Sequence, residues 1–158
     1  DFDQILSTFK FADATAGWIN FSSKYFTLSF RYPNGYVVCD SQNEISVLPK
    51  NGKCGLDEQG SSLKIFSIIR YIPPLTKVVA EQNIGYTSVK EYTVTVDETP
   101  FKAIEGVSQA QTNTCKSGSV RVIFDASYLF MTQYPNCDTS TDNLVVGTQI
   151  LSTFKFTK

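Results

Sequence analysis

Hydrophobic and polar positions alternate along most of the chain, and alternation with period two is typical of β-strands that bury one face. The clearest case is residues 26–32, where Phe26, Leu28, Phe30 and Tyr32 fall on one side. Such segments end at turn residues, among them glycine, proline and asparagine. We predict strands at residues 18–21, 26–32, 36–39, 44–48, 63–72, 89–96, 101–106, 119–124, 128–134 and 154–156.

Three segments depart from this alternation and shape the predicted architecture. Residues 63–72 are apolar on both faces, which is typical of a central strand covered on both sides of its sheet. Residues 75–82 and 142–153 carry apolar side chains at helical spacing, so we predict two helices there. Because hairpins dominate and βαβ alternation is absent, the pattern predicts an α+β fold built on an antiparallel β-sheet. Helices or long loops are expected to flank the central strand.

One eight-residue sequence occurs near both ends of the chain. Q-I-L-S-T-F-K-F fills residues 4–11 and again residues 149–156, an offset of 149 − 4 = 145 residues. That offset is about one domain length, which favours tandem copies of a domain over a short-period solenoid. We therefore interpret residues 1–11 as the tail of a preceding repeat unit, residues 12–17 as a linker and residues 18–158 as a single domain. The apolar tail is expected to be disordered or to dock, which suggests self-association through residues 1–11.

The composition narrows the class of protein. The chain has 158 residues, 42% of them hydrophobic, which fits one globular domain with a full core. A net charge of −1 gives no electrostatic reason for binding nucleic acid. No apolar run is long enough for direct membrane insertion. The chain starts at Asp1 without a signal peptide, which suggests a processed or excised fragment.

Four cysteines and the absence of histidine place the chain in an oxidising compartment. An even count without Cys-x-x-Cys argues against zinc and against a redox pair. The simplest account is two disulfides, which predicts an extracytoplasmic location: secreted, periplasmic or at the cell surface. The alternative is four reduced, buried thiols. The four residues are Cys39, Cys54, Cys115 and Cys137.

The predicted hairpin of residues 119–124 and 128–134 suggests how the cysteines pair. If residues 125 and 128 are opposed, the extended ladder brings position 116 near position 137. Cys115 and Cys137 then fall within disulfide reach, which leaves Cys39 to pair with Cys54.

Three motifs resemble those of PsbP-like domains. The opening W-I-N-F-S-S-K-Y-F-T-L-S-F-R-Y-P-N-G-Y, the middle K-E-Y-T-V-T-V-D-E-T-P-F-K-A-I-E-G and the closing Q-I-L-S-T-F-K-F together span residues 18–156. The chain departs from the family pattern with Phe26 for a glycine and Tyr36 for a tryptophan. The resemblance implies an α-β-α sandwich around an antiparallel sheet and an accessory or protein-binding role. It implies no enzyme activity, and fold alone does not settle function.

No motif points to a specific chemistry. Without histidine the chain lacks the commonest general base. Ser-x-x-Lys at residues 7–10, 61–64 and 152–155 falls in predicted strands, where the two side chains would point to opposite faces. Residues 138–142 start like a calcium loop but lack its glycine and final glutamate. The acidic pairs at residues 57–58 and 97–98 read as solvated turns. We expect no catalytic residue, metal or cofactor.

Two further features concern the surface. Residues 20–22 form an N-glycosylation sequon. The chain is rich in aromatic residues, and tyrosines are favoured at interfaces. Alternatively, they ring the edge of a phenylalanine core. A possible sugar- or peptide-binding surface comprises Tyr32, Tyr36, Tyr71, Tyr86, Tyr128 and Tyr134.

The sequence therefore predicts a non-enzymatic extracytoplasmic binding or accessory domain of a tandem-repeat surface protein. The expected partner is another protein or a cell-wall polymer. The alternatives are a structural spacer and a hydrolase that uses carboxylates.

Overall fold

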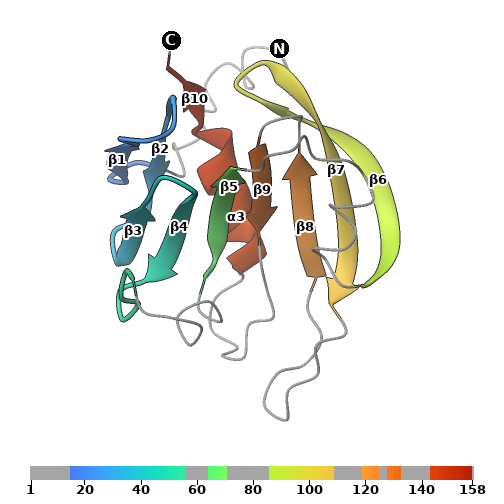
Figure 1. The fold of residues 1–158 in the computed structure, drawn as a ribbon, viewed down its shortest axis with the longest axis horizontal. Helices are drawn as coiled ribbons and strands as arrows, with labels where there is room; N and C mark the ends of the chain where they lie inside the picture. The colour runs from blue at the N-terminus through green and yellow to red at the C-terminus, as the bar shows by residue number, and fades with distance from the viewer. Residues whose placement is uncertain are drawn as a thin grey trace, which may run out of the picture.

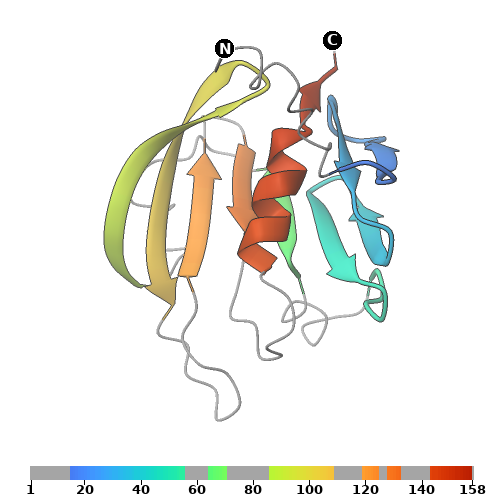
Figure 2. The same cartoon turned by 180° about the vertical axis from the view of Figure 1, so that it is seen from behind.

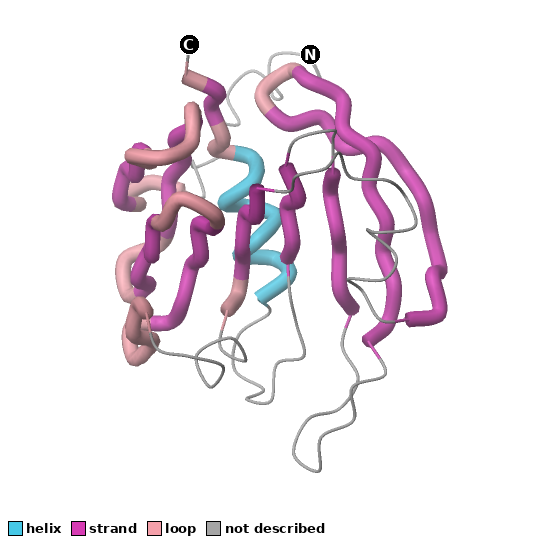
Figure 3. Tube along the Cα trace, in the orientation of Figure 1, coloured by secondary structure: helices cyan, strands magenta, loops and turns pink. Residues whose placement is uncertain are grey.

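The computed structural model describes residues 15–55, 64–70, 86–108, 119–124, 128–132 and 143–157. Within these ranges strands dominate and a single helix is present (Figure 3). The elements are β1 (Ile19–Ser22), β2 (Leu28–Tyr32), β3 (Tyr36–Asp40), β4 (Glu44–Pro49), β5 (Phe66–Arg70), β6 (Tyr86–Val96), β7 (Thr99–Ser108), β8 (Ser119–Phe124), β9 (Tyr128–Thr132), α3 (Asn143–Ser152) and β10 (Lys155–Phe156).

The strands form two antiparallel sheets. A three-stranded sheet has the order β1-β2-β10, and a seven-stranded sheet has the order β3-β4-β5-β9-β8-β7-β6 (Figure 1). Most neighbours in the larger sheet are also neighbours in sequence, as hairpins require. The exception is β5, which pairs with β9. β5 therefore lies inside the sheet, as its two-sided apolar pattern predicted.

The predicted α+β fold, with helices flanking the sheet as an α-β-α sandwich, is wrong for the part of the chain that the structure describes. α3 lies across one face of the larger sheet near β5 and β9 (Figures 1 and 2). Among the described residues, the smaller sheet also covers that face, because Leu28 and Phe30 of β2 belong to the same buried cluster as Ile45 and Phe66. A second sheet thus covers part of a face for which helices or long loops were predicted. The predicted helix at residues 75–82 lies outside the described residues.

The core lies between the two sheets and α3. Its aromatic centre is Phe154, whose ring stacks on that of Phe30 at 5.1 Å and meets that of Phe66 edge-on at 5.8 Å. Ile150 and Leu151 of α3 are buried beside it. Offset and edge-on aromatic pairs stabilise a core beyond the area that they bury.

The opposite face of the larger sheet is also buried over its central strands. Cross-strand partners share a face, so Ile104 and Val122 point away from α3, and both are buried. The same face carries two buried serines, Ser46 of β4 and Ser67 of β5. Burial on both faces explains why β5 and its neighbours lack a clean alternation of apolar and polar residues.

The hairpin of β8 and β9 has the predicted register. Phe124 lies opposite Leu129, and Val122 lies opposite Met131. This ladder is the one that would bring positions 116 and 137 together. Cys115 and Cys137 themselves lie outside the described residues, so their pairing stays a prediction.

The predicted disulfide between Cys39 and Cys54 is confirmed. Cys39 lies on β3 and Cys54 follows β4, with their Cα atoms 5.4 Å apart. The bridge closes a loop with a sequence separation of 15 residues. It fastens the β3–β4 hairpin, which stands at one edge of the larger sheet.

The turn between β6 and β7 has an unusual backbone. Val96 pairs with Thr99, so Asp97 and Glu98 are the two central residues of the hairpin turn. Their φ angles are 46° and 64°. Positive φ at both central positions is the requirement of a type I′ turn, which glycine and asparagine usually meet.

Candidate functional site

A shallow concavity of 530 Å³ opens over the three-stranded sheet and the end of α3. Most of the side chains around it are polar, and two of them are cationic. It is lined by Asn20, Phe21, Ser22, Ser29, Phe30, Arg31, Ser152, Thr153 and Lys155.

The pleat of the smaller sheet places the polar residues of this concavity on one face. Asn20 lies opposite Arg31, and Ser29 lies between Ser22 and Lys155 on the neighbouring strands. Residues of opposite parity on β2, such as Leu28 and Phe30, turn into the core. The alternation that builds the core therefore also builds a polar outer face.

Two hydroxyl groups of the concavity are committed to the backbone. Thr153 Oγ1 accepts from the backbone N–H of Arg31 at 2.8 Å and donates to the carbonyl of Ile150 at 2.7 Å. Ser152 Oγ donates to the carbonyl of Gln149 at 2.7 Å. The carbonyl groups in the last turn of a helix lack partners within the helix. In α3 the hydroxyl groups of Ser152 and Thr153 donate to two of these carbonyls.

Three other polar side chains of the concavity are open to a ligand. Among the described residues, no hydrogen-bond partner is found for the side chains of Asn20, Ser22 and Ser29. Asn20 and Ser22 are exposed and Ser29 is half-buried. An amide and two hydroxyls supply both donors and acceptors.

The two cations at the concavity come from the paired strands β2 and β10. Lys155 Nζ forms an ion pair with Asp97 Oδ1 at 3.0 Å, and 71% of its side chain is exposed. Asp97 also accepts from the backbone N–H of Phe156 at 2.7 Å. The Phe156 hydrogen bond, followed by Lys155, holds the pKa of the Asp97 carboxyl below its usual range. Arg31, half-buried on β2, stands beside Asn20 on the same face.

A second polar cluster joins three strands to α3. Glu105 Oε2 accepts from Tyr92 Oη at 3.2 Å and forms an ion pair with Arg121 Nη2 at 3.2 Å. Arg121 Nη1 donates to Thr148 Oγ1 on α3 at 3.0 Å. Burial raises the pKa of Tyr92 to about 12, with a smaller contribution from Glu105 that Arg121 opposes. Every polar group in this cluster has a protein partner, so its role is to hold the helix on the sheet.

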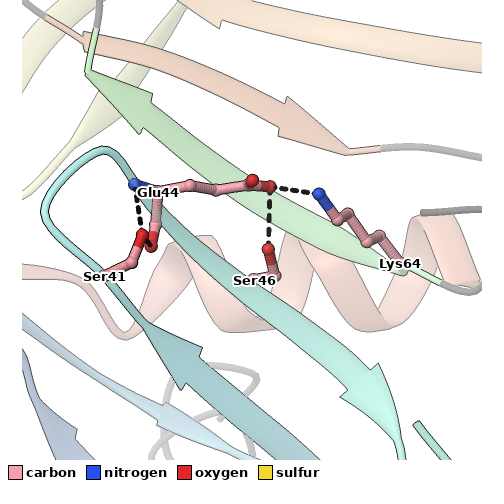
Figure 4. A network of polar contacts seen from close by, with 4 residues as sticks. All are labelled: Ser41, Glu44, Ser46 and Lys64. Carbon is pink, nitrogen blue, oxygen red and sulfur yellow. Dashed lines mark hydrogen bonds and ion pairs between the residues drawn. The ribbon is translucent and has the colours of Figure 1, made fainter. Parts of the chain in front are cut away.

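A third network surrounds Glu44 at the start of β4 (Figure 4). Glu44 Oε1 accepts from Ser46 Oγ at 2.7 Å and from Lys64 Nζ at 2.6 Å. Ser41 Oγ accepts from the backbone N–H of Glu44 and donates to the backbone carbonyl of Glu44. A serine next to a carboxylate and a lysine suggests nucleophile chemistry. The lysine ammonium, however, pairs with the carboxylate, and Ser46 is only 6% exposed. The network therefore supplies the hydrogen bond that the buried Ser46 hydroxyl needs, and it does not activate Ser46 as a nucleophile.

The structure places only two of the predicted binding tyrosines fully. Tyr32 and Tyr36 are half-buried and pack against the core, and burial raises the pKa of Tyr36. Tyr86 and Tyr128 belong to β6 and β9, but their side chains lie outside the described residues. Tyr71 and Tyr134 lie outside them altogether. A shared tyrosine surface stays a prediction.

The Ser-x-x-Lys motifs, the acidic pairs and the calcium-loop-like segment form no common site among the described residues. Ser152 and Lys155 make separate contacts, with the carbonyl of Gln149 and with Asp97. Asp97 and Glu98 form the tight β6–β7 turn rather than a facing carboxylate pair. Residues 57–61 and 138–142 lie outside the described ranges. Where the structure describes the chain, no group of three or more potential metal ligands is found.

Sequence reasoning missed the polar face of β1, β2 and β10. The signal was present, because residues alternating with the buried Leu28 and Phe30 are Ser29 and Arg31. It could not be used without knowing that β10 pairs with β2. That pairing joins residues more than 120 positions apart.

Comparison with known proteins gives no family assignment. No protein-family model matches the chain, and no curated protein matches it significantly. The resemblance to PsbP-like domains therefore stays a prediction. The Cys39–Cys54 disulfide is compatible with an extracytoplasmic protein. Among the described residues, no helix is long and apolar enough to cross a membrane.

Proposed function

We propose that this chain is a non-enzymatic extracytoplasmic binding domain of a tandem-repeat surface protein, and that the concavity over β1, β2 and β10 binds an acidic cell-wall polymer. The observation that carries the proposal is the row of Asn20, Ser22 and Ser29 beside Arg31 and Lys155: the side chains of this row have no partner among the described residues. Polar groups left open next to cations suit a ligand that carries both hydroxyl and anionic groups.

The shape and chemistry of the concavity favour an extended polymer over a small molecule. The hollow is shallow and lies along strands, so a chain can run across it. Arginine binds carboxylates and phosphates through paired N–H groups, and lysine acts as a mobile point charge. Arg31 and Lys155 are the two cationic side chains that line the concavity, and Lys155 also forms an ion pair with Asp97.

Several observations support a role without catalysis. The chain has no histidine, and Ser46, which lies next to the Glu44–Lys64 ion pair, is buried with its hydroxyl bonded to Glu44. Glu105 and Asp97 are likewise engaged in ion pairs with Arg121 and Lys155. The disulfide supports the extracytoplasmic location, and the repeated octapeptide supports the tandem arrangement.

The test is affinity electrophoresis or calorimetry with two defined acidic polymers, polygalacturonate and poly(glycerol phosphate). Neutral dextran serves as the control polymer. We expect Arg31→Gln to weaken binding about tenfold or more, because a charge-assisted hydrogen bond contributes roughly 1.5–3 kcal/mol. Asn20→Ala should weaken it less.

The control variant is Lys50→Gln, which removes one charge from an exposed residue outside the concavity. It should leave affinity nearly unchanged. Equal losses for Arg31→Gln and Lys50→Gln would mean non-specific attraction. No binding of either acidic polymer would contradict the proposal and favour the spacer alternative.

A further inference from the structure

The segment that closes this domain is repeated elsewhere in the chain. Residues 4–11 and 149–156 are identical, and the structure describes the second copy completely. The described copy shows what these eight residues bind. Any contact that it makes through its own side chains and backbone is therefore open to the first copy.

The second copy fills a slot between the two sheets. Ile150 and Phe154 are 0% and 1% exposed, and Leu151 is 5% exposed. Phe154 lies against Phe30 of β2, and Phe156 stacks on Phe101 of β7 at 5.9 Å. These four apolar side chains add to the direct packing of the smaller sheet on the larger one.

The backbone of the same copy completes the smaller sheet. Lys155 and Phe156 pair with Ser29 and Leu28, which makes β10 an edge strand on β2. Thr153 Oγ1 accepts from the backbone N–H of Arg31, and Asp97 accepts from that of Phe156. In each of these contacts one partner belongs to the repeated octapeptide, and the other belongs to β2 or to the β6–β7 turn.

The residues that flank the two copies define how far the likeness extends. Thr157 donates its backbone N–H to the carbonyl of Thr27 at 2.9 Å, and Ala12 at the matching position has the same N–H. Thr148, which accepts from Arg121, is matched by Asp3, a better acceptor for a guanidinium. The buried Gly147 is matched by Phe2, which is too large for that place. Residues 3–12 are thus the part that fits.

We infer that residues 3–12 of one chain are a ligand for the closing slot of a second copy, in place of residues 148–157. In the intact chain the slot is filled by its own C-terminal copy. When the C-terminal copy leaves the slot, residues 3–12 of a second chain enter it. This exchange links the two chains. The inference is independent of what the concavity binds.

The test uses four full-length chains: the parent, Phe9→Asp, Phe154→Asp and the double variant. The substitutions are matched, because each places one charge at the same position of an identical octapeptide. Circular dichroism reports folding, and light scattering after gel filtration reports mass. We expect Phe9→Asp to behave as the parent, Phe154→Asp to stay folded as a dimer, and the double variant to lose the native fold.

Three outcomes would overturn the inference. Phe154→Asp unfolding as completely as the double variant would mean that the slot does not accept the first copy. A double variant as well folded as Phe154→Asp would mean that the first copy contributes nothing. A folded but monomeric Phe154→Asp chain would mean that the first copy acts within its own chain.

A second measurement does not depend on the variant folding by itself. A synthetic peptide of residues 3–12 is added to the double variant, and recovery of the native circular dichroism spectrum is followed. The parent peptide should restore the spectrum, and the same peptide carrying Phe9→Asp should not. Equal effects of the two peptides would overturn the inference.

Discussion

Individual side chains, rather than whole elements, fasten α3 to the larger sheet. Tyr92, Glu105 and Arg121 come from β6, β7 and β8, and the chain of contacts ends on Thr148 of the helix. The guanidinium of Arg121 also lies 5.8 Å from the centre of the Tyr92 ring. Such a network is fully satisfied only in the folded state, so its ionisation is tied to stability.

The first prediction is a pH dependence from Tyr92. Its pKa of about 12 exceeds the ordinary value of 10.0, so the folded state holds the phenolic proton more tightly than the unfolded state does. This contribution to stability is complete below pH 10 and is lost as the pH rises through 12. Absorbance at 295 nm should show a tyrosine that titrates near 12 in the parent chain and is missing from Tyr92→Phe. A difference spectrum that titrates near 10 would contradict the prediction.

At the scale of elements, the β6–β7 hairpin combines an unfavourable backbone with a useful contact. Asp97 and Glu98 both have positive φ, which costs a residue with a side chain roughly 1–2 kcal/mol. The Asp97 carboxylate in return holds Lys155 and the backbone N–H of Phe156. Glu98 makes no such contact with β10 among the described residues.

The second prediction follows from that difference. Glu98→Gly should raise the free energy of unfolding by about 1 kcal/mol, because glycine adopts positive φ without strain. Glu98→Ala is the matched control, since it removes the same charge but keeps the side-chain clash. Urea unfolding of both variants measures the effect. A gain of equal size for alanine would show that charge, not backbone strain, is responsible.

The third prediction concerns the Cys39–Cys54 bridge on the β3–β4 hairpin. Replacing both residues by serine should lower the free energy of unfolding by about 3 kcal/mol, because the bridge closes a loop of 15 residues. Urea unfolding of parent and variant checks this.

Non-reducing peptide mapping of the parent should also show Cys115 joined to Cys137. A link from Cys39 to either of those two residues would contradict the pairing.

At the scale of the whole molecule, one short closing segment contacts both sheets. β10 pairs with β2 of the smaller sheet, and Ile150 and Phe154 occupy the core against the larger sheet. Asp97 adds a polar link from the β6–β7 turn to the same segment. Loss of this segment therefore removes core contacts with both sheets, unless its N-terminal twin takes its place.

The fourth prediction uses these two identical segments as matched deletions. A chain without residues 1–11 should keep its melting temperature within about 2 °C, since a change of 1 kcal/mol shifts it by a few degrees. A chain that lacks both residues 1–11 and residues 149–158 should fail to fold, because neither copy can then fill the slot and burying each large apolar side chain is worth roughly 1.5–3 kcal/mol. Thermal unfolding followed by circular dichroism compares them. Failure of the first chain to fold would show that residues 1–11 are integral to the domain.

Much of the local structure could be predicted from the amino-acid sequence. Alternating residues such as Phe26, Leu28 and Phe30 predicted β2, and apolar positions at helical spacing predicted α3. The ladder of the β8–β9 hairpin and the pairing of Cys39 with Cys54 were also predicted. These features depend on neighbours within about 15 residues, where period and turn chemistry leave few choices.

The elements that cover the core and the residues of the polar outer face could not be predicted, because both depend on contacts between distant parts of the chain. Burial of both faces of β5 requires cover but does not specify whether a helix or a sheet provides it, so the predicted sandwich was wrong. Likewise, Asn20, Ser29 and Lys155 form one polar row only because β10 returns to pair with β2. Such long-range pairings depend on how whole elements pack, and the residues that meet carry no local mark of their partners.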